Sequence, residues 1–269
     1  KSKFSKSKLL AQEEKNDSNR FIFIGKKYNK KIDSGWYFEK NFSKFETINF
    51  KGISFNYSNG IFLDYNQKDK IIIIRKKLPE ARIIIKNQIV NNLNIHFFDE
   101  TSIDNSVFID ENGLTGCLTF YDSEIINSKI KIFNAKCEDA VNFINTEGSI
   151  EDIEIYAAGS DALDLDFSNL NIKNIFVNEA GNDCADFSFG NYFVENLNVI
   201  QCGDKGLSVG EISTVNIQKA VSENSIIGIA SKDGSITKIK NANLNKVDTC
   251  VSAYTKKPEF NGGNLIVEN

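Results

Sequence analysis

Small and apolar residues recur along this chain with a period of 22 residues. The small residues of this series are Ala140, Ala162, Cys184, Gly206, Gly228 and Cys250. Each is followed by an apolar residue, and apolar and polar positions then alternate, as in Val141, Asn142 and Phe143. Alternation with a period of two predicts a β-strand. Its recurrence in every repeat is typical of a solenoid, in which each repeat forms one coil.

A second apolar series with the same period predicts a second strand in each coil. Its members are Ile155, Val177, Val199 and Val221. Short strands joined by turns rich in Asn, Asp and Gly predict the coils of a parallel β-helix, with about 4.8 Å between neighbouring coils. No coil can bury its apolar side alone, so stability is shared between neighbours. We therefore expect an all-β solenoid.

The regularity of the repeat divides the chain into two parts. Residues 101–269 follow the repeat and predict regular coils. Residues 1–100 contain β-rich but irregular segments such as KIIIIRKK and ARIIIKN, and we expect an N-terminal cap with irregular leading coils there. A cap is needed because the open end of a β-helix is an unpaired sheet edge. The last segment, GGNLIVEN, stops within a strand pattern, so we expect the natural chain to continue.

The composition argues against several kinds of partner and site. The net charge is −4 and the isoelectric point is about 5.3, which does not favour binding to nucleic acid. No apolar stretch reaches the roughly 18 residues of a membrane span, so none is expected. His96 is the only histidine, which nearly excludes histidine-based catalysis and His-rich metal sites.

The cysteines are expected to be unpaired. The chain contains Cys117, Cys137, Cys184, Cys202 and Cys250. Their odd number and the lack of a CxxC motif argue against zinc and against a full set of disulfides. Those in the small-residue series lie on coils that are not adjacent, so they cannot pair there. We expect buried free thiols that pack as small apolar side chains.

Acidic residues line up in the position just before the small residues. This series reads Asp139, Asp161, Asp183 and Lys205. Asp164 and Asp186 form a second series with the same spacing. Stacked coils place the members of a series about 5 Å apart. At this distance like charges repel, raise the pKa of one member or recruit a cation. Either a ligand offsets this cost, or each aspartate caps the N–H groups of a turn.

Four consecutive segments carry a resemblance to a known family. They read GSDALDLD, GNDCADFS, CGDKGLSVGE and GIASKDGS. In this order they resemble four motifs of the polygalacturonase family of pectin hydrolases, which fold as right-handed parallel β-helices. Asp161 and Asp183 match aspartates of these motifs, and Lys232 lies near the position of a late lysine. The resemblance implies a right-handed parallel β-helix that acts on a polysaccharide.

The sequence departs from that family at two positions. Asn182 stands where the family has a carboxylate of its acid–base set, and Lys205 stands where it has a histidine. The mechanism of the family therefore does not carry over intact. The segments CGDKGLSVGE, GIASKDG and AYTKKPEFNGG also resemble β-helix modules beside spore-coat kinase-like domains in bacterial surface proteins. This second resemblance implies the same fold and no particular chemistry.

The first functional hypothesis is a carbohydrate-active enzyme, either glycoside hydrolase-like or lyase-like. Its catalytic candidates are Asp161, Asp183, Asp186 and Lys205, and its substrate-binding candidates are Asp139, Asp164, Asp204, Glu211, Lys232, Asp233 and Tyr254. Hydrolysis needs two carboxyls roughly 6.5–9.5 Å apart for inversion or about 5–5.5 Å apart for retention. A lyase would use a lysine as the base and could hold Ca²⁺ between the acids; no other cofactor is expected. Nearby acids raise the pKa of a lysine, so we place the lyase second.

The alternative hypothesis is a non-catalytic module that binds glycans or serves as a structural part of a cell surface. Aromatic side chains would then stack on sugars, and the candidates are Tyr254, Phe260, Phe189 and Tyr192. Both hypotheses predict a polysaccharide or oligosaccharide partner and an extracellular or cell-envelope location. In an enzyme, Asp161, Asp183 and Lys205 would face an open cleft. In a structural module, they would turn onto backbone N–H groups.

Overall fold

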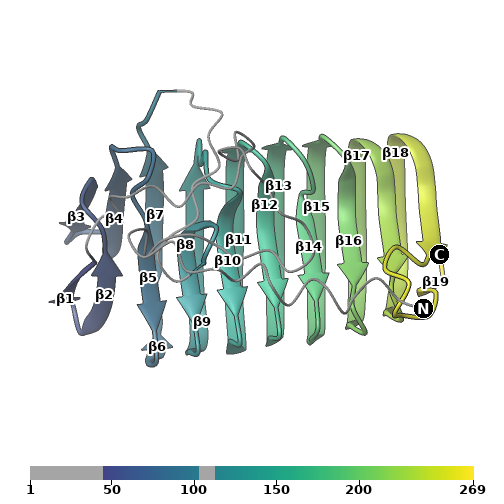
Figure 1. The fold of residues 1–269 in the computed structure, drawn as a ribbon, viewed down its shortest axis with the longest axis horizontal. Coiled ribbons are helices and arrows are strands. Elements are labelled where there is room, and N and C mark those ends of the chain that lie inside the picture. Colours follow the sequence, from purple (N-terminus) through teal and green to yellow (C-terminus); the bar gives the residue numbers. More distant parts are fainter. Residues whose placement is uncertain (1–44, 103–112) are drawn as a thin grey trace, which may run out of the picture.

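The computed structural model describes residues 45–102 and 113–269, and this part of the chain contains strands and no helix. The strands stack into a parallel β-solenoid of about eight turns with about 22 residues per turn. Figure 1 shows the coils side by side along one axis, with the N-terminal strands at one end and the C-terminal strands at the other. The predicted all-β solenoid is confirmed. Within the described residues, no helix has the length and apolar character to cross a membrane.

Antiparallel strands form the N-terminal end of the described chain. The first seven strands are β1 (Glu46–Phe50), β2 (Ile53–Tyr57), β3 (Ile61–Asn66), β4 (Ile71–Lys76), β5 (Ile83–Lys86), β6 (Ile89–Asn91) and β7 (Asn94–Asp99). β1 pairs with β2, β2 with β5 and β3 with β4, all antiparallel, whereas β4 and β7 begin the parallel ladder. These strands cover the first parallel edge, which would otherwise be open to pairing. Residues 1–44 of the predicted cap lie outside the described residues.

Each regular coil contains one short strand and one long strand. The short strands are β8 (Gly116–Tyr121), β10 (Asp139–Ile144), β12 (Asp161–Asp166), β14 (Ala185–Ser188) and β16 (Lys205–Gly210). The long strands are β9 (Glu124–Phe133), β11 (Glu147–Ala158), β13 (Asn169–Ala180) and β15 (Asn191–Cys202). The C-terminal strands are β17 (Thr214–Lys232), β18 (Ile236–Tyr254) and β19 (Asn264–Val267). β17 is long enough to pair with both β15 and β16.

The core consists of the inward-pointing residues of the short and long strands. In the short strands these are the apolar positions of the repeat, such as Val141, Leu163 and Leu207, and they are fully buried. Phe120 and Phe143 stack inside the solenoid with their ring centroids 4.7 Å apart. Because successive side chains of a strand point to opposite faces, the residues between these apolar positions point outward. The register of the core therefore fixes the position of every outward side chain.

The register of the second apolar series changes at one point. Ile155, Val177 and Val199 lie side by side as predicted, but Val199 pairs with Ser222 and not with Val221. The turn after β16 contains one extra residue, because Ser188 pairs with Gly210 but Asn191 pairs with Thr214. In this turn Glu211 and Ile212 adopt positive φ angles of 45° and 63°. The repeat is therefore 23 residues long from Asn191 to Thr214. The prediction that Val221 continues this series is wrong.

The prediction of free thiols is wrong for four of the five cysteines. Cys117 pairs with Cys137, and Cys184 pairs with Cys202, at sequence separations of 20 and 18 residues. These separations are slightly shorter than one coil, so the turn before a strand returns beside the preceding coil. Pairing therefore occurs between a strand and a turn, and not within the small-residue series. Cys250 is free, but it is exposed and not buried.

The segment after β18 folds back over the solenoid. The backbone N–H groups of Lys256 and Lys257 donate to Asp233 Oδ1, at 2.6 and 2.8 Å. Phe260 makes an edge-to-face contact with Phe189, with ring centroids 6.2 Å apart. Figure 1 shows this loop near the C-terminal end, in front of the last coils. The loop thus brings residues late in the chain to the outward side of β14 and β16.

Candidate functional site

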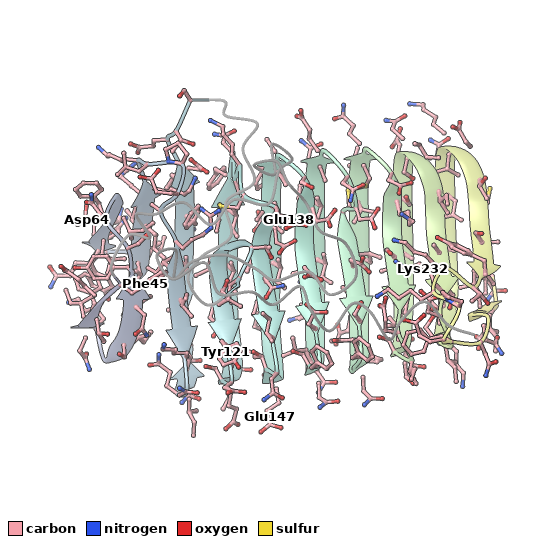
Figure 2. The ribbon with its side chains drawn as sticks, viewed as in Figure 1. Phe45, Asp64, Tyr121, Glu138, Glu147 and Lys232 are labelled. Carbon is pink, nitrogen blue, oxygen red and sulfur yellow. A yellow bond between two sulfur atoms is a disulfide. The ribbon has the colours of Figure 1, made fainter. Side chains whose placement is uncertain are left out.

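The predicted acidic site lies on the outward side of β10, β12, β14 and β16, which we call the acidic face. It comprises three columns. The first is Asp139, Asp161, Asp183 and Lys205; the second is Asn142, Asp164, Asp186 and Ser208; the third is Asp166, Ser188, Gly210 and Lys232. Figure 2 labels Lys232, which lies over the strands toward the C-terminal end of this face. The repeat thus brings the predicted residues of consecutive coils together on one wall.

The first column is tied to the backbone of the coils. Asp161 Oδ1 accepts hydrogen bonds from the backbone N–H of Asp183 at 2.8 Å and from Asn182 Nδ2 at 2.7 Å. Asp183 Oδ1 in turn accepts the backbone N–H of Lys205 at 3.0 Å. Each carboxylate therefore caps an N–H group of the next coil, which is the structural role considered for these residues. Asn182, where the polygalacturonase motif has an acid, orients Asp161.

Lys205 is a buried counter-ion and is unsuited to act as a base. Its Nζ lies 3.3 Å from Asp183 Oδ1 and also contacts Asp204 Oδ2, while its side chain is only 9% exposed. Burial opposes the charged form, but the hydrogen bond to Asp204 and the charge of Asp183 outweigh it and raise the pKa of Lys205. A lysine that holds its proton more tightly than usual cannot readily remove one from a substrate. The lyase-like mechanism through Lys205 therefore lacks support.

Asp139 and Asp161 have carboxyls that retain protons. Burial raises the pKa of Asp139 to about 8, although Thr115 Oγ1 donates a 2.5 Å hydrogen bond to its Oδ2. Burial also raises the pKa of Asp161 to about 6, against the hydrogen bond from the N–H of Asp183. These two aspartates therefore stay partly or largely neutral where an exposed aspartate is ionised.

The second column contains the most crowded carboxyls. Asn142 Nδ2 donates a 2.6 Å hydrogen bond to Asp164 Oδ2. Burial, followed by the charges of Asp139 and Asp166, raises the pKa of Asp164 well above its ordinary value. The pKa of Asp166 is also raised by burial, and its carboxyl lies within hydrogen-bonding reach of Asp164 and Asn142. These three side chains therefore form one connected hydrogen-bonded group.

Asp186 is next to this group and faces a lysine. Its carboxylate Oδ2 lies 3.7 Å from Lys232 Nζ, whose side chain is 4% exposed. Burial raises the pKa of Asp186, while the charge of Lys232 opposes the shift. Asp186 Oδ1 and Ser208 Oγ are both buried, and a hydrogen bond from the Ser208 hydroxyl also opposes the rise in the pKa of Asp186. Lys232 is thus the cation of the described chain that partly balances the second column.

Glu211 and Asp233 anchor the loop of residues 255–263 at the edge of the acidic face. Glu211 accepts hydrogen bonds from Ser188 Oγ at 2.6 Å and Lys257 Nζ at 2.5 Å. Burial opposes ionisation, but these bonds hold the pKa of Glu211 below its usual value. Asp233 accepts the two backbone N–H groups of the loop. Tyr254 pairs in register with Lys232, just before the loop.

Two exposed phenylalanines lie at the turn beside the acidic face. Phe167 and Phe189 follow β12 and β14, and their rings stack with centroids 4.6 Å apart. Their φ angles are 51° and 50°, a left-handed conformation that a bulky residue rarely adopts. The rings cover one face of each other, and Phe167 and Phe189 remain 53% and 39% exposed. Phe189 was a predicted aromatic candidate, and Phe167 could have been found from its spacing of 22 residues to Phe189.

The other aromatic candidates differ in accessibility. Tyr192 is 2% exposed, and its hydroxyl donates to the backbone oxygens of Leu165 and Ser188. It therefore belongs to the core and cannot grip a ligand. Phe260 is half-buried against Phe189. His96 is half-buried between Phe98 and Phe133, where burial lowers its pKa.

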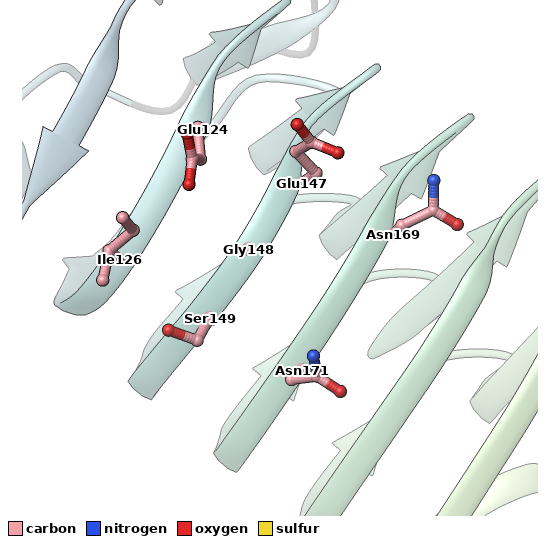
Figure 3. A pocket seen from close by; sticks show the side chains of 7 residues that line it. All are labelled: Glu124, Ile126, Glu147, Gly148, Ser149, Asn169 and Asn171. Atoms are coloured by element: carbon pink, nitrogen blue, oxygen red, sulfur yellow. The ribbon is translucent and has the colours of Figure 1, made fainter.

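A shallow hollow lies on another side of the solenoid. Figure 3 shows it at the start of β9, β11 and β13, where Glu124, Glu147 and Asn169 stand in register with one another. The sequence did not predict it. It is separate from the acidic face, so it gives no cleft above Asp161, Asp183 or Lys205.

A group of candidate metal ligands lies in the core. Asp99, Cys117 and Cys137 are buried close together. The two cysteines are joined in a disulfide, and Asp99 Oδ2 lies 2.8 Å from Lys76 Nζ. Neither thiolates nor a free carboxylate are therefore offered to an ion.

Comparison with family models finds no match, and comparisons with curated proteins and with solved structures find no significant match. The resemblance to polygalacturonases therefore rests on its short motifs alone. The assignment of the fold as a solenoid rests on the strand register of the structure. Any function must be argued from the acidic face.

Proposed function

We propose that this protein binds an extended polysaccharide along its acidic face without cleaving it. The observation that carries the proposal is the stacking of acids on acids in consecutive coils, with few cations to balance them. A solenoid does not need this arrangement, because the same chain places opposite charges side by side elsewhere. Uncompensated, partly buried carboxyls disfavour folding. A ligand that hydrogen-bonds to them would offset that cost.

The long strands show how the same chain arranges charged residues outside the acidic face. Their outward side, which we call the paired face, joins lysines and acids of adjacent coils. The ion pairs are Lys129–Asp152 at 2.7 Å, Lys131–Glu154 at 2.8 Å, Lys173–Glu151 at 3.1 Å and Lys246–Glu223 at 2.9 Å. In these pairs on the paired face, each charge is therefore balanced by an opposite charge within the molecule. The acidic face lacks this ion pairing over Asp139, Asp164 and Asp166, and of these Asp164 and Asp166 are partly exposed to a partner.

A sugar polymer suits the chemistry of the acidic face. Its columns run along the solenoid axis, so they repeat the same polar groups at about 4.8 Å intervals. Ionised carboxylates accept hydrogen bonds from sugar hydroxyls, and a carboxyl that keeps its proton can also donate one. Phe167 and Phe189 add an apolar edge beside these groups. The polymer class fits the shape because an extended chain can contact several coils at once.

Two features favour binding over catalysis. Asp161 and Asp183 use their Oδ1 atoms to cap backbone N–H groups, which ties them to the fold. Lys205 is paired with two carboxylates and is not poised as a base. The two disulfides are typical of oxidising compartments, which supports an extracellular or cell-envelope location.

One observation favours a second candidate function, glycoside hydrolysis. The raised pKa of Asp161, about 6, suits a general acid near neutral pH. The neighbouring Asp183 carboxylate, on the next coil, would then act as its partner at the short spacing typical of a retaining enzyme. In that case Asp161→Asn would abolish turnover while leaving the fold intact, because Asn still accepts the N–H of Asp183.

A panel of acidic and neutral oligosaccharides tests both candidates. The protein is incubated with each, and binding is measured by calorimetry while shortened products are sought by chromatography. We expect binding without products, and at least tenfold weaker binding in Asp164→Asn/Asp186→Asn. Asp152→Asn, on the paired face, is the matched control and should bind as the wild type does. If the wild type releases shortened products and Asp161→Asn does not, the protein is a hydrolase and the binding proposal is wrong. If all variants bind equally well, the acidic face is not the binding site.

A further inference from the structure

The hollow at the start of β9, β11 and β13 presents polar groups at regular intervals. Its volume is about 520 Å³, within the roughly 300–1,000 Å³ of small-molecule sites. Figure 3 shows its side chains in two rows across the three strands, the first made of Glu124, Glu147 and Asn169 and the second of Ile126, Ser149 and Asn171. Neighbouring strands lie about 4.8 Å apart, so each row repeats its groups at that spacing.

A β-bulge and a glycine shape the backbone of the hollow. The pairing of β9 with β11 shifts by one residue after Gly148, so that Ile126 and Asn127 of β9 stand opposite Ser149 alone. Bulges are frequent next to active sites, where they redirect side chains. Gly148 has a φ of 120°, and a Cβ at this position would lie 2.1 Å from the carbonyl oxygen of Ile125. The hollow is therefore set by the backbone and not by the rotamers of a few surface side chains.

The polar side chains of the hollow are open to a ligand. Within the described residues, neither Glu124, Glu147 nor Asn171 has an ion pair or a side-chain hydrogen bond. Asn169 Oδ1 accepts a 2.9 Å hydrogen bond from Asn191 Nδ2, which leaves the Nδ2 of Asn169 to donate. Carboxylates accept hydrogen bonds, and amides both donate and accept them. The hollow thus offers donors beside acceptors.

We propose that the hollow binds a short saccharide without negative charge. A sugar hydroxyl donates to one group and accepts from another, which suits the carboxylates of Glu124 and Glu147 beside the amides of Asn169 and Asn171. Glu124 and Glu147 are in register on adjacent coils. They therefore repel a sugar that carries a carboxylate or sulfate. The ligand class is accordingly a neutral sugar and not an acidic one.

Apolar side chains flank these polar groups. Ile126 lines the hollow, and Phe193 lies in register with Asn171 on the next coil, where its side chain is partly exposed. Ligand sites combine such apolar contacts with a few polar groups that fix orientation, and the C–H groups of a sugar ring supply the matching surface. The hollow is separate from the acidic face, so this inference does not depend on polysaccharide binding there.

NMR titration followed by amide signals tests the site. The neutral probes are cellobiose, maltose, lactose and N,N′-diacetylchitobiose, and the acidic probe is digalacturonate. We expect saturable shifts of the Gly148 N–H and the Asn171 side-chain amide with at least one neutral disaccharide. Digalacturonate should bind there at least tenfold more weakly.

Two exposed positions of the hollow supply the variants. Asn171→Ala and Glu147→Ala should each weaken binding of the neutral disaccharide about fivefold, the effect of losing one ordinary hydrogen bond. Asn178→Ala is the matched control, because Asn178 lies at the other end of the same strand, β13. It should bind as the wild type does. The remaining amide signals of each variant check that it is folded.

Three results would overturn the inference. They are the absence of saturable shifts at Gly148 and Asn171 with every neutral disaccharide, binding of digalacturonate there as tight as that of the neutral probes, and affinities that Asn171→Ala and Glu147→Ala leave unchanged. Asp164→Asn/Asp186→Asn should leave the shifts at Gly148 as they are in the wild type. Since the readout is local to the hollow, failure of the acidic face and failure of the hollow are told apart.

Discussion

The acidic face and the paired face both lie on the parallel strands of the solenoid, but their charged residues are arranged in opposite ways. On the paired face, Lys129 and Asp152 of adjacent coils lie 2.7 Å apart, and Asp152 has a lowered pKa: burial opposes the shift, but hydrogen bonds from Lys129 and Asn174 outweigh it. On the acidic face, Asp139 and Asp161 of adjacent coils stand next to each other, and burial raises both pKa values. The ladder therefore does not dictate which charges meet.

The difference predicts opposite pH dependence for the two faces. Asp139 and Asp161 have folded pKa values above their unfolded value of 3.8, so the folded protein binds their protons more tightly. Their contribution to stability is complete below about pH 4 and is lost as the pH rises through about 6 and 8. Asp152 has a lowered pKa, so its contribution is present above its unfolded pKa and is lost on acidification.

Lys205→Met should have the largest effect on the comparison. The substitution leaves the Asp183 carboxylate, whose side chain is 5% exposed, without its counter-ion. Loss of one partner of a buried pair costs about 3–5 kcal/mol of the free energy of unfolding. Chemical denaturation at pH 7 measures it. Lys173→Met on the paired face is the control, because Lys173 is 52% exposed and its loss should cost less than about 1 kcal/mol. Equal losses in both variants would contradict the contrast between the faces.

Asp139→Asn should stabilise the protein at alkaline pH. Asn resembles the protonated carboxyl and can still accept the hydrogen bond from Thr115. At pH 8 the variant should therefore gain at least about 1.4 kcal/mol in the free energy of unfolding, the equivalent of one pKa unit. The gain should vanish near pH 4, where the wild-type carboxyl is protonated in both states. Thermal unfolding across this pH range measures it, and a variant less stable than the wild type at pH 8 would show that Asp139 is needed as an anion.

Lys257→Met should loosen the loop that borders the acidic face. Glu211 loses one of its two side-chain partners but keeps Ser188, and Lys257 is 46% exposed, so the expected loss is about 1 kcal/mol. Hydrogen exchange should become faster at residues 255–263 and stay unchanged in β11 and β13. Lys256→Met is the control, since Lys256 bonds to Asp233 through its backbone N–H. Unchanged exchange in Lys257→Met would mean that the backbone bonds to Asp233 hold the loop alone.

Asp152→Asn should give the smallest effect. The ion pair with Lys129 is partly exposed, and such pairs contribute roughly 0.2–1 kcal/mol. Its removal should destabilise the protein slightly at pH 7, opposite in sign to Asp139→Asn at pH 8. A double-mutant cycle with Lys129→Met isolates the pair. If Asp152→Asn stabilised the protein, the changes in unfolding free energy on the two faces would have the same sign, and the contrast between them would be wrong.

The sequence predicts the fold and the stacking because both follow from one period. A 22-residue spacing sets the register, and the register places Asp139 beside Asp161. Burial cannot be derived this way, since it depends on how the neighbouring coils and the loop of residues 255–263 pack. The sequence therefore indicated that one acid would have a raised pKa without showing that Asp139 is the more strongly shifted.

The errors of the sequence analysis have one physical origin, which is departure from the period. The disulfide between Cys184 and Cys202 joins the bend before β14 to the last residue of β15, so a count along one column misses it. The extra residue near Ile212 shifts the first part of β17 by one position against β15, which removes Val221 from its series. The spacing of 22 residues returns where Leu207 pairs with Ile229. Turns are the places where coils gain or lose residues, and there the repeat ceases to predict contacts.

Residue-resolved titration of the aspartate carboxyls by carbon-detected NMR tests the central claim most directly. The claim is that burial on the acidic face, without enough cations to oppose it, makes carboxyls keep protons that carboxyls of the paired face release. We expect Asp161 to titrate near pH 6 and Asp139 near pH 8, with Asp152 below its ordinary value. Titration of Asp139 and Asp161 near pH 4, together with Asp152, would contradict the account.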